Sequence, residues 1–256
     1  MRKENSMRKK IIGGLAILII ATLAWAGDVW KSKPPSQWTE KDVADILTNS
    51  PWARANVSVF GANNTQGMTQ ASGSGGTAGS KTDMSKNAAG ATPDTAGGTE
   101  KQDEAAAASA SYSVYWWSSR TIRAASMRRA VLKGTKTQED VDKTLANTPE
   151  DYMVLIQSVN MAIFQRRGEQ AFEKSAWLQM KKSKEKVFPT KVDFLKAADG
   201  TTVNGVIFYF PKKSASGEPT IATDEKEIDF YLFVGGSKIL TAFDPRKMTD
   251  NQGEDL

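Results

Sequence analysis

The chain contains neither cysteine nor histidine among its 256 residues. Without cysteine no disulfide can form, so an ordinary hydrophobic core must stabilise the fold. Without histidine, Ser-His-Asp and Cys-His catalysis are excluded, together with the commonest general base and most zinc sites. The sequence also lacks a P-loop, a dinucleotide-binding fingerprint and a calcium-binding loop. We therefore expect no cofactor and no metal ion, and we assign no catalytic residue.

The first 26 residues have the pattern of a secretory signal peptide. A basic n-region with five Lys and Arg residues precedes an uncharged, mostly apolar run of 13 residues, from Ile11 to Leu23. Ala24-Trp25-Ala26 is an A-x-A cleavage signature, which predicts cleavage after Ala26 and a periplasmic or extracellular protein. The run is shorter than the about 20 apolar residues of a membrane span. An uncleaved N-terminal anchor is the alternative, and a membrane contact is expected only in that case.

The positive charge of the chain comes mainly from this leader. The whole chain carries 34 Lys and Arg against 29 Asp and Glu, a net charge of +5. Residues 1–26 hold five of the basic residues and one acidic residue, so the remainder carries only +1. Such a balance gives no reason to expect a nucleic-acid partner. Both Met1 and Met7 precede a basic stretch, so the sequence leaves the start of translation open.

A Gly-, Ser- and Ala-rich segment, residues 61–111, divides the chain. It contains no Val, Ile, Leu or aromatic residue, so it buries too little apolar surface to offset its conformational entropy, and we predict a disordered insertion. Residues 27–60 are too few to fold alone, so we assign them to one domain together with 112–256. The strand-like stretches 56–60 and 112–117 are expected to pair as a hairpin with the insertion as its loop.

The stretch WTEKDVADILTNSPWAR, residues 38–54, predicts a helix. Thr39 is a good N-cap, and Asp42 three residues later makes a weak capping box. Three apolar residues then share one stripe of the helix: Val43, Ile46 and Leu47. A proline after the helix ends it. We interpret the stretch as scaffold, with Trp38 and Trp52 as anchors; the alternative is a recognition surface built on the two tryptophans.

The remainder predicts an α+β fold, an antiparallel sheet of five or six strands with helices mainly on one face. Helices are expected up to Lys133 after a cap at Ser118 or Ser119, over 138–147 after a Thr137 cap, and over 160–184. The expected core residues of the last helix are Ile163, Phe164, Ala171, Trp177 and Leu178. Strands are expected over 152–159, 192–198, 203–210, 228–234 and 238–243, with hairpin turns at 199–200 and 235–237. Alternation in 228–234 places Ile228, Phe230, Leu232 and Val234 on one face and Asp229, Tyr231 and Phe233 on the other.

Four stretches carry a resemblance to a known group: PPSQWTEKDVADILTNSPWA (34–53), YWWSSRTIRAA (115–125), VIFYFPK (206–212) and KILTAFDPRKM (238–248). Together with the leader, they resemble a group of uncharacterised exported proteins of acidobacteria-type bacteria. The resemblance covers nearly all of the chain after the leader except 61–111. It implies an envelope or secreted location. It implies no known activity, so it assigns no functional residue.

The helix expected after Ser119 carries five cations and no acid: Arg120, Arg123, Arg128, Arg129 and Lys133. Such a helix can contact a phosphate, a lipid headgroup or an acidic polysaccharide. At about 100° per residue, however, these side chains spread around the helix. Solvated charges and ion pairs are therefore the more ordinary interpretation. For an anion or sugar site, the candidates are Arg120 and Arg123 beside Trp116 and Trp117, because Arg next to an aromatic face forms cation–π pairs.

Glu227 and Asp229 are the carboxylates that we weigh for catalysis. A glycosidase needs two carboxyl groups about 5–9 Å apart across a cleft, and alternate residues of one strand are about 7 Å apart. The ordinary interpretation of an acidic run over 224–229 is a polar strand edge that prevents aggregation. Ser183 and Lys186 match the S-x-x-K of penicillin-recognising enzymes, but the partner motifs S-D-N and K-T-G are absent, so we treat the match as chance.

We expect an exported, non-catalytic binding or structural protein of the bacterial envelope, whose partner is another envelope protein or a glycan. The expected partner contacts are Trp38, Trp52, Trp116, Trp117, Arg120 and Arg123. The alternative is a carboxylate-dependent hydrolase that acts on envelope glycans through Glu227 and Asp229. The sequence leaves open whether any catalysis exists, and the missing histidine favours binding.

Overall fold

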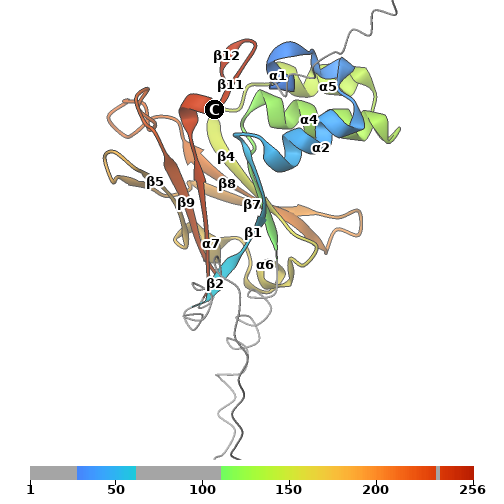
Figure 1. Cartoon of the computed structure of the whole chain (residues 1–256). Helices are drawn as coiled ribbons and strands as arrows, with labels where there is room; N and C mark the ends of the chain where they lie inside the picture. The colour runs from blue at the N-terminus through green and yellow to red at the C-terminus, as the bar shows by residue number, and fades with distance from the viewer. Residues whose placement is uncertain (1–27, 62–110, 235–236) are drawn as a thin grey trace, which may run out of the picture.

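The computed structural model describes residues 28–61, 111–234 and 237–256. Within these ranges two five-stranded antiparallel sheets face each other, and most helices gather at one end of them (Figure 1). The predicted α+β class with an antiparallel sheet of five strands is confirmed. The strands expected to form one sheet are divided between two. The leader predicted over 1–26, and all but the end residues of the insertion predicted over 61–111, lie outside the described residues.

Sheet A has the strand order β1-β3-β4-β8-β7. Its strands are β1 (Ala53–Val57), β3 (Tyr112–Trp116), β4 (Asp151–Gln157), β8 (Val203–Pro211) and β7 (Lys191–Lys196). β1 and β3 are antiparallel, with Ala53 opposite Tyr115, so the predicted pairing across the insertion is confirmed for β1, whereas residues 59–60 of the predicted strand belong to the second sheet. The paired strand begins three residues earlier than expected. β4 is central, as predicted, and Val154, Leu155 and Ile156 are buried on both of its faces.

Sheet B has the strand order β2-β10-β9-β5-β6. Its strands are β2 (Val59–Gly61), β10 (Ser237–Phe243), β9 (Ile228–Val234), β5 (Ala176–Met180) and β6 (Lys186–Val187). The predicted alternation in β9 is confirmed, because every second residue from Ile228 to Val234 is buried. The ring centroid of Phe230 lies 5.5 Å from that of Phe208 and 6.3 Å from that of Phe210 in sheet A. The main core therefore lies between the two sheets.

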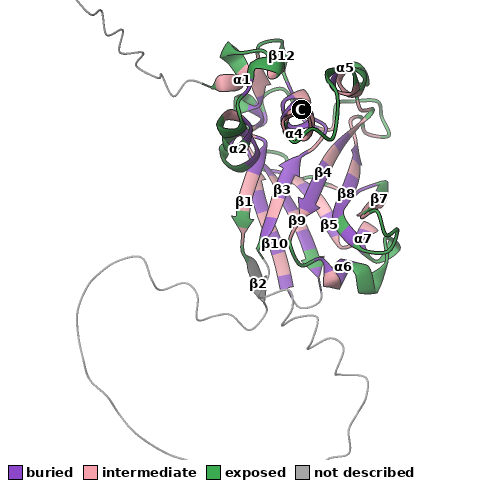
Figure 2. Cartoon of the chain, turned by 90° about the vertical axis from the view of Figure 1, so that its right-hand side faces the viewer, coloured by how far each residue is buried: buried purple, intermediate pink, exposed green. Residues whose placement is uncertain are grey.

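Figure 2 shows where the helices lie relative to the strands. One end of the sheets carries α1 (Val29–Ser32), α2 (Glu40–Asn49), α4 (Arg120–Leu132) and α5 (Gln138–Ala146), and the other end carries α6 (Ala162–Arg167) and α7 (Gln170–Glu173). Short 3-10 turns, η1 (Pro35–Gln37) and η2 (Pro245–Lys247), and a C-terminal hairpin, β11 (Thr249–Asp250) and β12 (Gly253–Glu254), complete the fold. Within the described ranges, no helix has both the length and the hydropathy of a membrane span.

The predicted helix starts are confirmed by their caps. The Thr39 hydroxyl accepts the N–H of Asp42, and the Asp42 carboxylate accepts the N–H of Thr39, a complete capping box. α5 begins with the same box at Thr137. The Ser119 hydroxyl accepts the N–H of Ile122 at the start of α4. These contacts span three residues, which is why the sequence pattern reveals them.

The long helix predicted over 160–184 is wrong. α6 ends at Gly168, whose φ of +74° favours glycine, and the chain continues through α7 into β5. β5 pairs with β9, about 50 residues away in sequence, and local propensity does not reveal such a partner. Of the expected core residues, Ile163, Phe164 and Leu178 are buried, Ala171 is exposed, and Trp177 is half-buried on the outer face of sheet B.

Candidate functional site

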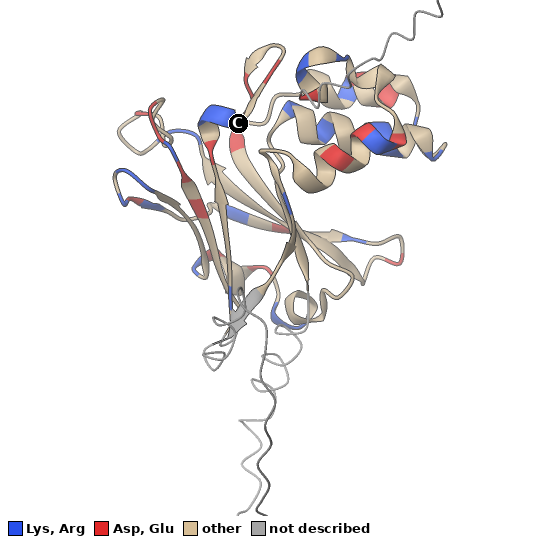
Figure 3. Cartoon of the chain, in the orientation of Figure 1, with Lys and Arg blue, Asp and Glu red and all other residues tan. Residues whose placement is uncertain are grey.

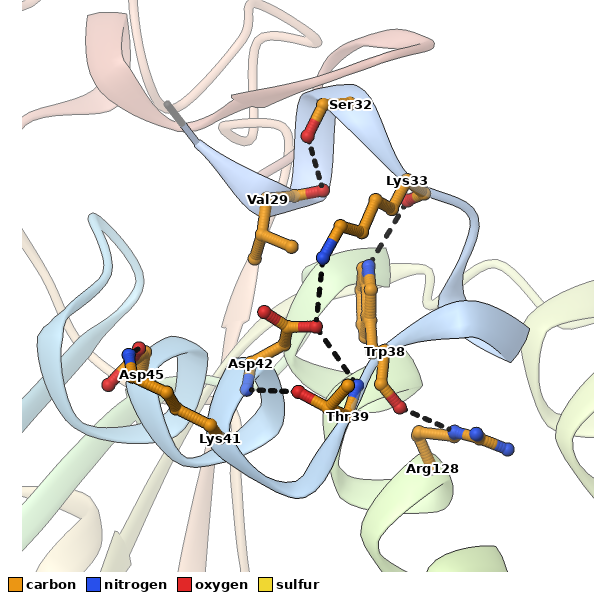
Figure 4. Close-up of polar contacts among 9 residues, drawn as sticks. All are labelled: Val29, Ser32, Lys33, Trp38, Thr39, Lys41, Asp42, Asp45 and Arg128. Atoms are coloured by element: carbon orange, nitrogen blue, oxygen red, sulfur yellow. Dashed lines mark hydrogen bonds and ion pairs between the residues drawn. The ribbon is translucent and has the colours of Figure 1, made fainter. Parts of the chain in front are cut away.

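Three of the tryptophans predicted to contact a partner are core residues. Trp38, Trp52 and Trp116 are 2%, 0% and 0% exposed. Because their rings are covered, they cannot form a contact surface, and this part of the prediction is wrong. Trp38 is also held by its polar groups: its Nε1 donates to the Lys33 carbonyl at 3.1 Å, and its carbonyl accepts from Arg128 Nε at 2.9 Å (Figure 4). Burial supports the scaffold interpretation of residues 38–54.

Arg120 and Arg123 are engaged in internal bonds. The Arg120 guanidinium donates two hydrogen bonds to the Asp250 carboxylate, at 2.9 and 2.8 Å. Arg123 is buried and donates to the carbonyls of Thr144 and Asn147, where α5 ends. Burial lowers the pKa of the Arg123 guanidinium. The two arginines therefore join α4 to the C-terminal hairpin and to α5, and the expected anion contact loses its basis.

Trp117, the sixth expected contact residue, is half-buried and packs against the core. A cavity of about 350 Å³ lies near Arg120, between η1 and the C-terminal hairpin, with Trp30 and Asp250 among its lining residues. Two of its charged lining residues, Arg120 and Asp250, form an ion pair with each other. The six residues expected to contact a partner therefore stabilise the fold and do not form one open surface.

An aromatic surface that the sequence analysis did not identify lies on the outer face of sheet B. The ring of Trp177 in β5 is nearly parallel to those of Tyr231 and Phe233 in β9, with centroids 5.1 and 5.4 Å apart and an interplanar angle of 15° in both pairs. Phe188, just after β6, lies 6.1 Å from Trp177. We call these four residues the aromatic ladder. Phe188 and Phe233 are 48% and 42% exposed, so the ladder is open to solvent.

The register of sheet B builds this ladder. Trp177 lies directly opposite Tyr231, and opposed residues on one face of a sheet have Cβ atoms about 5 Å apart. Leu240 of β10 lies opposite Tyr231 on its other side and extends the apolar surface. Alternation in β9 placed Tyr231 and Phe233 on one face from sequence alone. Trp177 was missed because its segment was assigned to a helix.

Polar side chains lie beside the ladder. Gln179 is paired with Asp229 and with Lys186, in the row next to Trp177. The Lys186 Nζ lies 4.5 Å from the Trp177 ring centroid, a cation–π contact. Within the described part of the chain, neither the Gln179 amide nor the Asp229 carboxylate has a hydrogen-bond partner. Burial and, secondarily, the charge of Glu227 raise the pKa of Asp229. The ladder is therefore bordered by free hydrogen-bonding groups.

Glu227 and Asp229, the carboxylates weighed for catalysis, do not face each other across a cleft. Glu227 accepts from Lys181 Nζ at 2.7 Å, and both side chains of this ion pair are exposed. Asp229 lies on the outer face of sheet B, and Figure 3 shows basic residues of the β5–β6 turn near acidic residues at the start of β9. A glycosidase places its carboxyl groups on opposite sides of a bound sugar. An open sheet face favours binding.

The remaining acidic residues of this run stabilise the loop before β9. The buried Glu225 carboxylate accepts the backbone N–H groups of Lys182 and Lys226, and Asp224 forms an ion pair with Lys182. Among the residues that the structure describes, no cluster of three or more acidic side chains is placed to hold a metal ion. The run therefore joins the β5–β6 turn to the start of β9.

Comparison of the chain with models of known protein families, with curated proteins and with solved structures finds no match. The aromatic ladder is therefore the candidate site on its geometry alone. Its chemistry combines exposed rings, a cation over one ring, and an amide and a carboxylate that form no side-chain hydrogen bond with any residue the structure describes.

Proposed function

We propose that the protein is an exported, non-catalytic binding protein of the bacterial envelope that holds a glycan on the aromatic ladder. One observation carries the proposal: Trp177, Tyr231 and Phe233 stack nearly in parallel on the open outer face of sheet B. A monomeric soluble protein has little reason to leave such a cluster uncovered unless it is used for contact. The export pattern of the leader supports an envelope location.

A glycan fits the border of the ladder better than an apolar protein surface does. The C–H face of a pyranose ring packs on aromatic rings, and its hydroxyl groups need donors and acceptors nearby. Gln179 offers both, and Asp229 offers an acceptor, with no partner among the described residues. An apolar protein partner would desolvate these two groups without compensation, which is costly.

Binding of the purified chain to peptidoglycan and to soluble neutral and acidic polysaccharides tests the proposal, by co-sedimentation and calorimetry. The loss of one aromatic contact worth about 1.5 kcal/mol weakens binding about tenfold. We therefore expect such a loss for Phe233→Ala and for Phe188→Ala. Val159→Ala is the matched control, because Val159 is fully exposed outside the ladder. Unchanged glycan binding in both ladder variants, or binding to proteins alone, would refute the proposal.

A hydrolase is the second candidate, and the raised pKa of Asp229 beside the ladder is the observation that favours it. A carboxyl group with a raised pKa can serve as a general acid. Release of reducing ends from the same polysaccharides measures this activity. Hydrolysis that is abolished by both Glu227→Gln and Asp229→Asn would replace the binding proposal. If no hydrolysis is detected, or if both variants retain it, the hydrolase proposal is refuted.

A further inference from the structure

A second concave surface lies between α2 and α4, far in the fold from the outer face of sheet B. It is a groove of about 340 Å³ whose floor is apolar. Val43 and Leu47 of α2, Tyr115 of β3 and Leu132 of α4 form this floor. Val43, Leu47 and Tyr115 are well packed, and Leu132 is half-buried, so the groove is preformed. The exposed Ala44 on its edge leaves room for a neighbour.

The two walls of the groove are helices, and this favours a helix as the occupant. The lining residues of α2 fall at i, i+3, i+4, i+7 and i+8 from Glu40, which is one face of a helix over two turns. At the end of α4, Arg129, Leu132 and the C-cap residue Lys133 fall at i, i+3 and i+4. A third helix laid between two packed helices buries its apolar stripe by the ordinary packing of side-chain ridges into grooves.

The lining residues carry two cations at the α4 wall and one carboxylate, Glu40, at the α2 wall, and this net positive charge favours an acidic helix. Arg129 and Lys133 stand one turn apart on the rim, and both are exposed. Within the described part of the chain, neither side chain has a hydrogen bond or an ion pair, and α4 contains no acidic residue. Two carboxylates that lie one turn apart on a partner helix would form ion pairs with these two cations.

We propose that the α2–α4 groove docks an acidic amphipathic helix of a partner protein. Its apolar stripe lies on Leu47 and Leu132, and its carboxylates contact Arg129 and Lys133. This surface is separate from the aromatic ladder, so the protein would hold a glycan on one face and a protein on another. Failure of the glycan proposal leaves this inference unaffected.

Fluorescence anisotropy with two labelled helical peptides tests the inference. The first peptide carries Leu at i, i+3 and i+7 with Glu along one side, and the second carries Lys in place of every Glu. We expect the acidic peptide to bind at least about fivefold more tightly. Arg129→Glu should reverse this preference, and Ala44→Trp should abolish binding by filling the groove. Lys196→Glu is the matched control, because it makes the same charge change at an exposed residue of β7.

Equal binding of the two peptides, or an unchanged preference in Arg129→Glu, would overturn the inference. So would self-association through the groove, which sedimentation velocity detects as a dimer that Ala44→Trp converts to a monomer. Photo-crosslinking from position 44 in intact envelopes then identifies the partner. Its captured segment must contain an acidic amphipathic helix, and capture of any other kind of segment counts against the proposal.

Discussion

Trp52 and Asp255 are joined by a hydrogen bond of 2.6 Å across 203 residues of sequence, from the indole Nε1 to the Asp255 carbonyl. The Asp255 carboxylate also accepts the backbone N–H groups of Arg120 and Thr121, at 2.6 and 2.9 Å. These are the first N–H groups of α4, where the helix dipole favours a negative charge. One buried residue of the C-terminal segment is therefore bonded both to the residue that precedes β1 and to the start of α4.

Replacing Asp255 is expected to destabilise the whole fold. Asp255→Ala leaves the N–H groups of Arg120 and Thr121 without an acceptor, and burying unsatisfied groups costs about 1–3 kcal/mol. We expect the free energy of unfolding to fall by about 2 kcal/mol or more, measured by urea denaturation. The neighbouring Glu254 is exposed, so Glu254→Ala is the control. Equal losses in the two variants would contradict this role of Asp255.

The ion pair of Arg120 with Asp250 is expected to contribute more than an exposed pair does. The side chain of Asp250 is 7% exposed and that of Arg120 is 31% exposed, whereas those of Lys143 and Glu139 are 71% and 77% exposed. Asp250→Ala should cost about 1–3 kcal/mol, because it leaves a partly buried charge without its partner. Glu139→Ala should change stability by about 0.5 kcal/mol or less. Similar losses of unfolding free energy in the two variants, measured by thermal or urea unfolding, would show that burial does not strengthen the Arg120–Asp250 pair.

The capping box of α2 gives a prediction at a single hydroxyl. Thr39→Ala removes the acceptor for the N–H of Asp42 and should lower the free energy of unfolding by about 1 kcal/mol. Thr39→Ser keeps the oxygen and should retain most of the stability. Because α2 forms one wall of the groove, Thr39→Ala should also weaken binding of the acidic peptide. A serine variant as unstable as the alanine variant would refute the capping role.

The turn between β7 and β8 is expected to depend on pH. The Thr202 hydroxyl and the N–H groups of Thr202 and Thr201 donate to Asp199 and lower its pKa from 3.8 to about 2. The ionised carboxylate is thus favoured in the folded state. Its contribution is complete above pH 3.8 and is lost as the pH falls through about 2. A ¹³C titration of the Asp199 carboxyl group should find the low pKa in the wild type. A midpoint near 3.8 would contradict the hydrogen bonds to Thr201 and Thr202.

Asp199→Asn separates this effect from general acid denaturation. The variant has no charge to lose at position 199, so its stability should fall less between pH 4 and 2 than that of the wild type. The comparison uses urea unfolding at each pH. Parallel curves would show that Asp199 does not contribute to the pH dependence.

Elements that depend on near neighbours could be predicted from the sequence. The Thr39 and Thr137 caps and the turn at Asp199 involve contacts within three residues. The alternation of β9 also placed Tyr231 and Phe233 together on its outer face. β5 could not be recognised in the same way, because its pairing with β9 is a contact between distant segments.

The tryptophans show why the candidate site could not be predicted from the sequence. Trp38, Trp52 and Trp116 were expected at a partner surface and are buried, whereas Trp177 was expected in a core and lies on the ladder. A large aromatic side chain is equally suited to a core and to an interface. Its place depends on which segments cover it, and that is set by strands far apart in sequence.

By itself, the sequence determined the helix caps, the β7–β8 turn, the lack of histidine and cysteine chemistry, and the α+β class, because each follows from composition or from contacts within a few residues. Only the tertiary structure decided the division into two sheets, the register that aligns Trp177 with Tyr231, and the return of Asp255 to Trp52. The physical reason is that backbone pairing and burial between distant segments are cooperative, so no single segment carries the information.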